Sequence, residues 1–173
     1  LSPAITNDTT PDITGTAEVG STVKLYSGET LPASWTQLGS DIDGEAADDS
    51  SGSSVSLSED GTIVAIGAYA NDDNGNDSGH TRIYQYANDS WTQLGSDIDG
   101  EDNQNYSGMS LSLSEDGTIV AIGALGNNGN GSISGHTRIY QYSSVDEEWT
   151  QLGSDIDGEA AGDSSGRSVD LSD

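Results

Sequence analysis

SWTQLGSDIDGE, residues 90–101, is the stretch that decides how this chain folds, because its sequence recurs. It is identical at 34–45, and at 148–159 it differs only by Glu148 in place of the first serine. Trp35, Trp91 and Trp149 mark the spacing and lie 56 and 58 residues apart. Recurrence at this period is typical of proteins that stack or array one small unit, and it argues against a single domain with one core.

The residues between these copies also recur. SVSLSEDGTIVAIGA at 54–68 recurs with one change as SLSLSEDGTIVAIGA at 110–124. GHTRIYQY at 79–86 recurs unchanged at 135–142. Each unit holds four strand signals: an apolar–serine alternation, an apolar run, the Thr-Arg-Ile-Tyr stretch and the tryptophan strand. The Asp-Gly pair favours a tight hairpin and antiparallel pairing. Four antiparallel strands in one unit predict a propeller-type blade, because a solenoid coil is usually shorter.

The fold class that we expect is therefore all-β, built of antiparallel four-stranded propeller-type blades. The repeat region spans 34–173 and comprises two complete blades, at about 52–95 and 108–153, flanked by partial strands at 34–39 and 166–172. Two blades cannot close a ring. The partners that we expect are the rest of a longer parent chain or other copies of this chain.

Small and aromatic residues recur at fixed places in each unit. Trp91 and Trp149 are expected on an outer strand, each burying its ring between blades. Small residues are expected on an inner strand where neighbouring blades crowd together, namely Ala65, Gly67, Ala68, Ala121, Gly123 and Ala124.

The charge balance limits the possible partners. The chain has 30 Asp and Glu against 4 Lys and Arg, with a formal net charge of −26 at pH 7. Nucleic acid and anionic membrane are poor partners for this chain, because little basic charge exists to neutralise phosphates. Like charge opposes compaction unless cations screen it, which favours a salty or calcium-rich setting. The longest apolar run, Ile63 to Ala70, is far below the roughly 20 residues of a membrane span, and without cysteine no disulfide or thiolate metal site can form.

SGSSVSLSEDGTIVAIGA at 51–68, followed by GHTRIYQY at 79–86, resembles the FG-GAP type of repeat, the blade unit of integrin-α-like propellers, in a bacterial variant. The resemblance covers about residues 34–173. It implies a propeller, commonly of seven blades, on a secreted or surface-attached protein concerned with adhesion. Calcium-binding members join the first two strands of a blade by a long Asp/Asn/Gly loop. This chain has only Ser58 to Thr62 there, so the family's calcium site is not expected.

Residues 1–33 stand outside the repeat and carry a second resemblance. PDITGTAEVGSTVKLY at 11–26 is similar to the opening of bacterial immunoglobulin-like modules found in surface adhesins. We expect two or three short strands there, which form a partial immunoglobulin-like β segment or a linker.

Calcium is the cofactor that the composition favours, since oxygen donors abound and thiolates are missing. Two kinds of segment offer candidate ligands: a glycine-containing polar loop, and the acidic triplet that follows each tryptophan. These are Asp72, Asp73, Asn74, Asn76 and Asp77 in the loop, and the triplets Asp41/Asp43/Glu45, Asp97/Asp99/Glu101 and Asp155/Asp157/Glu159.

Each kind of segment also has a second interpretation. The counterpart of the polar loop, residues 126–131, contains no carboxylate, which speaks against a repeated calcium site. In an extended strand, alternate acids lie about 6.5–7 Å apart, too far to share an ion, so a triplet must curl to bind one. The triplets are therefore either solvated connecting loops or metal contacts.

The remaining chemistry points away from catalysis. His80 and His136 stand at equivalent places and are expected to be hydrogen-bonded structural residues, while Arg82 and Arg138 are expected to pair with carboxylates. No nucleophile elbow or acid pair occurs, so we do not expect an enzyme. Sequons that would permit glycosylation stand at Asn7, Asn76, Asn88, Asn105 and Asn130.

The function expected from the sequence is a non-enzymatic, extracellular or cell-surface adhesion module, associated with calcium, whose surface protein or glycan ligand the sequence does not identify. An alternative is a structural protein, the subunit of an extracellular filament in which open chain ends join by strand addition. A propeller hydrolase or lyase is a third class, disfavoured because the acids recur with the repeat and do not converge on one site.

Overall fold

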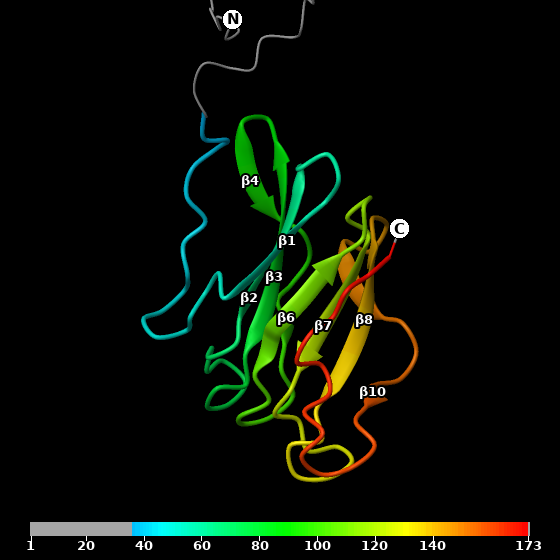
Figure 1. Cartoon of the computed structure of the whole chain (residues 1–173). Coiled ribbons are helices and arrows are strands. Elements are labelled where there is room, and N and C mark those ends of the chain that lie inside the picture. The colour runs from blue at the N-terminus through cyan, green and yellow to red at the C-terminus, as the bar shows by residue number, and fades with distance from the viewer. Residues whose placement is uncertain (1–35, 173) are drawn as a thin grey trace, which may run out of the picture. The chain divides into compact units, whose positions relative to one another are not determined.

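The computed structural model describes residues 36–172, and all regular structure in that range is β (Figure 1). Residues 36–172 contain no helix with the length and apolar character needed to cross a bilayer. The strands are β1 (Ser54–Leu57), β2 (Ile63–Ala68), β3 (His80–Ala87), β4 (Ser90–Gln93), β5 (Ile98–Asp99), β6 (Ser107–Leu113), β7 (Ile119–Ala124), β8 (His136–Ser143), β9 (Glu148–Gln151) and β10 (Ile156–Asp157).

These strands form two antiparallel sheets, one for each unit of the sequence. In the first sheet the order is β1-β2-β3-β4, and β5 pairs with β3; in the second, β6, β7 and β8 are adjacent, and β9 and β10 both pair with β8. We call β1–β5 the first blade and β6–β10 the second blade. The predicted all-β class and the antiparallel four-stranded blades are confirmed. The two described sheets do not close a ring.

The two blades have the same registers, as expected when their sequences repeat. Ser54 pairs with Gly67 in the first blade, and Ser110 pairs with Gly123 in the second. The predicted hairpin at Asp60-Gly61 is present: Gly61 has a positive φ of 71°, and the Ser58 amide donates to the Ile63 carbonyl at 2.9 Å. Glycine adopts this left-handed conformation at little cost, so the Asp-Gly pair fixes the turn.

The short strands β5 and β10 were not predicted. The Ile-Asp pair of each acidic triplet adds to the free edge at the start of the third strand, where His80 lies opposite Asp99 and Thr81 lies opposite Ile98. Ile98 is buried there and joins the main apolar cluster. The triplet Asp97/Asp99/Glu101 is therefore anchored to the first blade by its central isoleucine, Ile98.

The apolar core lies between the two blades, which stand side by side in Figure 1. First-blade residues such as Ile83 and Ile98 pack with Leu111, Leu113 and other second-blade residues in one cluster. The crowding predicted for the small residues is present, since a Cβ at Gly67 would collide with the carbonyl oxygen of Gly108. The blades are thus held together face to face through contacts that larger residues at Gly67 would disrupt.

Polar contacts at this interface recur at the next one. Leu113 N donates to Ser56 Oγ and Ser54 Oγ donates to Gly108 O, at 3.0 and 2.6 Å. The equivalent bonds join Ser112 and Ser110 of the second blade to Leu171 and Gly166, at 3.2 and 2.7 Å. Residues 165–172 therefore contact the second blade in the same way as β6 contacts the first blade.

The flanking partial strands are not formed in the described residues. Residues 36–39 and 166–172 carry no strand assignment, although both were predicted as strands. For 166–172 the reason is that residues 36–172 hold no equivalent of β2 or β7 with which this segment could pair. The predicted immunoglobulin-like segment, 1–33, lies outside the described residues.

Candidate functional site

A buried histidine at the start of β3 faces carboxylates from other segments. His80 is 1% exposed, and its Nδ1 lies 3.8 Å from Glu45 Oε2 and 3.7 Å from Asp97 Oδ2. Asp73 completes the group, because one ligand atom from each of the four residues lies within 4.8 Å of the others. We call Glu45, Asp73, His80 and Asp97 the first His cluster.

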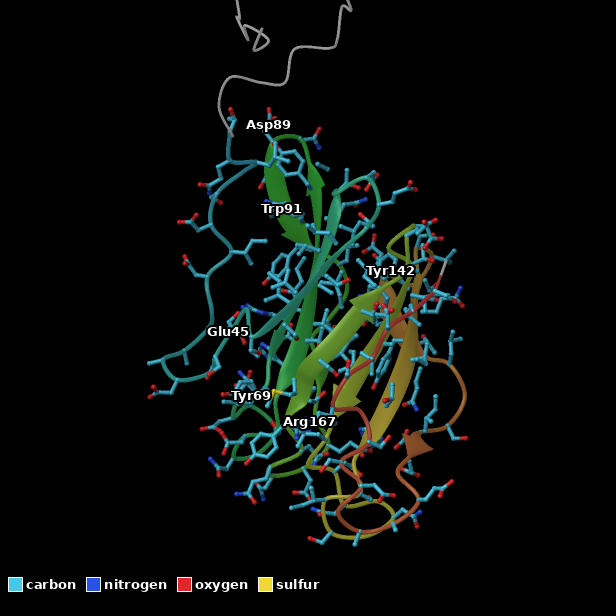
Figure 2. The ribbon with its side chains drawn as sticks, in the orientation of Figure 1. Glu45, Tyr69, Asp89, Trp91, Tyr142 and Arg167 are labelled. Carbon is cyan, nitrogen blue, oxygen red and sulfur yellow. The ribbon has the colours of Figure 1, made fainter. Side chains whose placement is uncertain are left out.

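The ladder explains why these groups meet. His80 stands opposite Ala68 on β2 and Asp99 on β5, so the small Ala68 side chain is its neighbour on one side and the acidic triplet on the other. Burial, and after it the nearby Asp97 carboxylate, raises the pKa of Asp99. Glu45 arrives from the segment that precedes β1, and Figure 2 shows it beside the first blade.

Arg82 binds one edge of the first His cluster. Its Nη1 lies 3.3 Å from Glu45 Oε1, and its Nη2 donates to the Asp43 carbonyl at 2.9 Å. The expected pairing of this arginine with a carboxylate is confirmed. Asp97 is bound differently, since its Oδ1 accepts a hydrogen bond from Gln93 Nε2 at 2.5 Å.

The second blade repeats the arrangement with two changes. Glu101, His136 and Asp155 form a second His cluster, with His136 Nδ1 3.5 Å from Asp155 Oδ2. Gly129 stands where the first cluster has Asp73. Arg138 binds Asp155 in bidentate fashion, from Nε and Nη2 at 2.8 and 2.7 Å, and also contacts Glu101. The second cluster thus has one carboxylate fewer and a more tightly bound arginine.

Electrostatics in the second His cluster follow from that arginine. The hydrogen bonds from Arg138 lower the pKa of Asp155 to about 2. Burial, and then the positive charge of Arg138, lowers the pKa of His136. Arg138 in turn has a raised pKa, since its bonds to Asp155 and Glu101 outweigh the effect of burial. The pairing predicted for Arg138 is confirmed.

The middle acidic triplet, Asp97/Asp99/Glu101, is divided between the two clusters. Asp97, the first acid of its triplet, lies at His80 of its own blade, whereas Glu101, the last acid, lies at His136 of the next blade. One triplet therefore does not wrap an ion by itself; its ends serve two successive histidines. The third triplet follows in part, with Asp155 at His136, while the Glu159 carbonyl accepts from Asn130 at 3.1 Å.

The hydrogen-bonding role expected of the two histidines does not extend to their Nδ1 atoms. The Nδ1 atoms of His80 and His136 are both buried and, within residues 36–172, have no hydrogen-bond partner. The carboxylate oxygens at 3.5–3.8 Å are beyond good hydrogen-bond distance. The identical GHTR motif in both units could have marked the histidines as a pair, but only the stacking of blades shows what they face.

The polar loop is held by hydrogen bonds within itself and to residues 100–103. Asp72 Oδ1 accepts from the Asp77 amide at 2.8 Å, and Asn74 Nδ2 donates to the Gly100 carbonyl at 2.7 Å. In the counterpart loop Asn128 Oδ1 accepts from the Ile133 amide in the same way, at 2.8 Å. The neutral side-chain amide of Asn128 thus accepts the same bond as the Asp72 carboxylate. The bond therefore does not depend on a bound ion. Of the predicted loop ligands, only Asp73 is brought to the first His cluster; Asn76 donates its backbone amide to Asn103 Oδ1 at 2.8 Å.

The short hairpin between the first two strands is also satisfied internally. Asp60 Oδ1 accepts bonds from Ser58 Oγ, Thr62 N and Thr62 Oγ1 at 2.8–2.9 Å. Asp116 accepts the equivalent three bonds in the second blade. These bonds, led by the one from the Thr62 amide, lower the pKa of Asp60. This is a turn-stabilising aspartate in place of a long ligand loop.

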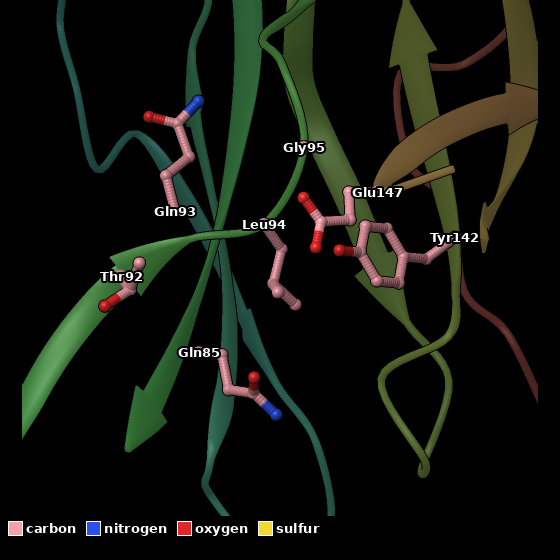
Figure 3. A pocket seen from close by; sticks show the side chains of 7 residues that line it. All are labelled: Gln85, Thr92, Gln93, Leu94, Gly95, Tyr142 and Glu147. Atoms are coloured by element: carbon pink, nitrogen blue, oxygen red, sulfur yellow. The ribbon is translucent and has the colours of Figure 1, made fainter. Parts of the chain in front are cut away.

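One surface depression of the described residues lies between the blades and holds no catalytic constellation. It lies near the outer strands, where Tyr142 and Glu147 of the second blade lie next to Leu94 (Figure 3). Glutamines and a threonine complete most of the lining, and Glu147 is its one ionisable acid. The depression therefore offers no acid pair or activated nucleophile.

The sequons differ in accessibility. Asn76, Asn88 and Asn130 are exposed, whereas Asn105 is 1% exposed and its Oδ1 accepts from Asn127 Nδ2 at 3.0 Å. Burial therefore removes Asn105 as an acceptor in the folded chain. Asn7 lies outside the described residues.

Comparison with known proteins gives one family. Residues 41–84 match the sequence model of the FG-GAP repeat, a range that includes the first acidic triplet, β1, β2 and the first half of β3. No curated protein sequence gives a significant match to the chain. The matched range contains Glu45, Asp73 and His80, three of the four residues in the first His cluster.

Proposed function

Because this chain is an FG-GAP repeat protein, we propose that it works as an extracellular, non-enzymatic adhesion module in which propeller-type blades stack and present their loops to a surface ligand. FG-GAP repeats in general indicate extracellular adhesion-type modules. The two-blade scaffold fits this role, since loops that carry recognition are best held on rigid strands. The ligand class in this proposal is a surface protein or a glycan.

The observation that carries the proposal is the unequal burial of equivalent residues. Leu111 and Leu113 of the second blade are 9% and 7% exposed because the first blade covers them, whereas Val55 and Leu57, at the same places in the first blade, are 55% and 56% exposed. An apolar face of this kind, already shaped to receive a blade, supports a function within a larger array of blades.

The opposite face of the pair supports the same proposal. Ile98 is 6% exposed in the first blade, but its equivalent Ile156 is 57% exposed in the second, and Leu152 is 42% exposed. Contacts between blades are heterologous, since one face of a blade meets the other face of the next. Such contacts continue until a ring closes or a neighbour is missing.

Calcium association is part of the proposal. The net charge of −26 opposes close packing of blades, and oxygen ligands are the ones that calcium prefers. Acids such as Asp43, Asp99 and Asp157 lie on the segments that connect one blade to the next, where a hard cation would reduce repulsion. Support for calcium comes from charge and ligand type alone.

A binding experiment tests the adhesion role. The labelled 173-residue chain is applied to immobilised glycans and extracellular surface proteins, in millimolar calcium and after chelation. We expect saturable binding to at least one class of ligand that weakens after chelation. Absence of binding on every surface, together with turnover of a glycan in solution, would contradict a non-enzymatic adhesion module.

A filament subunit is the second candidate, and one observation favours it. Residues 165–172 already make on the second blade the contacts that a first strand makes, including the parallel bridge between Gly135 and Ser165. A strand from another copy could pair with this segment, and repeated addition would build a fibre.

Light scattering distinguishes the two candidates. A monomer, or aggregates of irregular size, fits the adhesion module, and a regular polymer fits the filament. Deletion of 166–173 serves as the matched test, since a module tolerates the loss of this segment and a polymer dissociates without it.

A further inference from the structure

We propose that the first His cluster is a binding site for one divalent transition-metal ion of the zinc class. The ligands are His80 Nδ1 and the carboxylates of Glu45, Asp73 and Asp97. This goes beyond the calcium association proposed above, because calcium takes oxygen ligands, whereas a neutral imidazole nitrogen beside carboxylates suits zinc and its neighbours.

The buried imidazole is the observation that points to a ligand. His80 is 1% exposed, and its Nδ1 is buried without a hydrogen-bond partner among residues 36–172. A buried polar atom that is left unsatisfied in this way destabilises the fold. A bound cation would satisfy Nδ1, since a metal–nitrogen bond uses the same lone pair that a hydrogen bond would use.

Distances around Nδ1 fit a shared ion better than a hydrogen bond. The Glu45 and Asp97 oxygens lie 3.8 and 3.7 Å away, too far for good hydrogen bonds. Two ligands of a tetrahedral zinc ion, each bonded at about 2.0–2.1 Å, lie roughly 3.3 Å apart. Small side-chain movements would close the cluster around one ion, and the exposed Asp73 lies on the side open to solvent.

Charge favours a cation at the first cluster over the second. Three carboxylates surround His80, and Arg82 is directed to Glu45 and the Asp43 carbonyl. Among residues 36–172 the second His cluster has only two carboxylates within ligand distance, and Arg138 binds both. With one arginine at each cluster, the formal charge left beside the histidine is −1 at the second cluster and −2 at the first. The second cluster is therefore the weaker cation site and serves as a built-in control for the first.

The test is titration of the full, untagged chain with Zn²⁺ by calorimetry in millimolar calcium, repeated with Co²⁺ so that visible absorption reports the ligands. We expect one ion per wild-type chain. His80→Gln should abolish binding, His136→Gln should leave it unchanged, and Asp73→Asn should weaken it by roughly 10–100-fold or more. Asp73 is exposed, so this variant keeps the test valid if His80→Gln does not fold.

Opposite results would overturn the site. If Asp73→Asn and folded His80→Gln bind Zn²⁺ with wild-type affinity, these side chains are not ligands. If His80→Gln and His136→Gln lose the same amount of Zn²⁺ affinity, the distinction between the clusters is removed. Displacement of Zn²⁺ by millimolar Ca²⁺ would assign the cluster to a hard cation instead. Glycan or protein adhesion is measured separately, so a failure here leaves the proposed function standing.

Discussion

Single residues hold the connecting turns of the blades, and Asp116 is the clearest case. Its Oδ1 accepts bonds from Ser114 Oγ, Thr118 N and Thr118 Oγ1, and the bond from the Thr118 amide is the main reason why its pKa lies below 3.8. A carboxylate whose pKa is lower in the folded state stabilises the fold above its unfolded pKa. That stabilisation is lost as the pH falls through the lowered value.

We predict that Asp116→Ala destabilises the chain at pH 7 and that the difference from wild type shrinks as the pH falls below about 3.8. Urea unfolding at several pH values measures this. Ser144→Ala, on an exposed turn residue of the same blade, serves as the control and should behave as wild type. A difference from wild type that is the same at pH 3 and pH 7 would show that the carboxylate charge is not the cause.

Arg138 gives a second prediction at this scale. Its bidentate bonds set the pKa of Asp155 at about 2, so Arg138→Met should return that pKa toward 3.8. NMR titration of the Asp155 carboxyl carbon measures the change. An unaltered pKa in the folded variant would mean that another group, such as Gln151, is the main cause.

The residues of the candidate site were only partly predictable. Glu45, Asp97, Glu101 and Asp155 were candidates because the acidic triplets are conspicuous in the sequence. Which acid meets which histidine was not predictable, since Glu101 reaches His136 only through the stacking of the second blade on the first. Spacing within one repeat carries no information about contacts between repeats.

At the scale of elements, the inner strands pack through glycine. A Cβ at Gly67 would collide with the Gly108 carbonyl oxygen, and one at Gly123 would collide with that of Gly166. Gly67→Ala should therefore separate the two blades and destabilise the chain by about 1–3 kcal/mol or more. Gly52→Ala is the comparison, because a Cβ there meets nothing within 4 Å and only its positive φ of 85° opposes the change. Thermal unfolding measures the stability of both variants. A larger loss of stability in Gly52→Ala than in Gly67→Ala would contradict the packing of the two blades.

Each tryptophan strand is bonded to the segment that leads into its blade. Trp149 Nε1 donates to Leu94 O at 2.9 Å, and Trp91 Nε1 donates to Leu38 O at 2.8 Å. We predict that Trp149→Phe, which keeps an aromatic ring beside Tyr142, costs about 1 kcal/mol of unfolding free energy. If chemical denaturation shows almost no decrease in the unfolding free energy of Trp149→Phe, water replaces this bond without cost.

The elements themselves were largely predictable from sequence. Four strands of each blade carry local sequence signals. These are an alternation of apolar residues with serine, an apolar run, a β-branched and aromatic stretch, and a tryptophan strand. The two-residue strands β5 and β10 were missed, because Ile98–Asp99 and Ile156–Asp157 are too short to show a period. Their formation depends on the free edge that β3 and β8 offer.

At the scale of the whole molecule, the described chain is a short array of blades with one buried interface and two exposed apolar faces. The same sequence motif is buried where a neighbour is present and exposed where none covers it. This contrast is the reason for the proposal that the protein works within a larger array of blades. It also gives an internal control, since equivalent positions can be changed in both settings.

The most direct measurement compares the unfolding free energies of Leu113→Ala and Leu57→Ala with that of wild type, in dilute monomeric samples. Leu113 is 7% exposed and Leu57 is 56% exposed, although both occupy the same place in their blades. We predict a loss of about 2–5 kcal/mol for Leu113→Ala and a change within about 0.5 kcal/mol for Leu57→Ala. Equal losses in the two variants would contradict the central claim that blades stack face to face and leave the first face open for a neighbour.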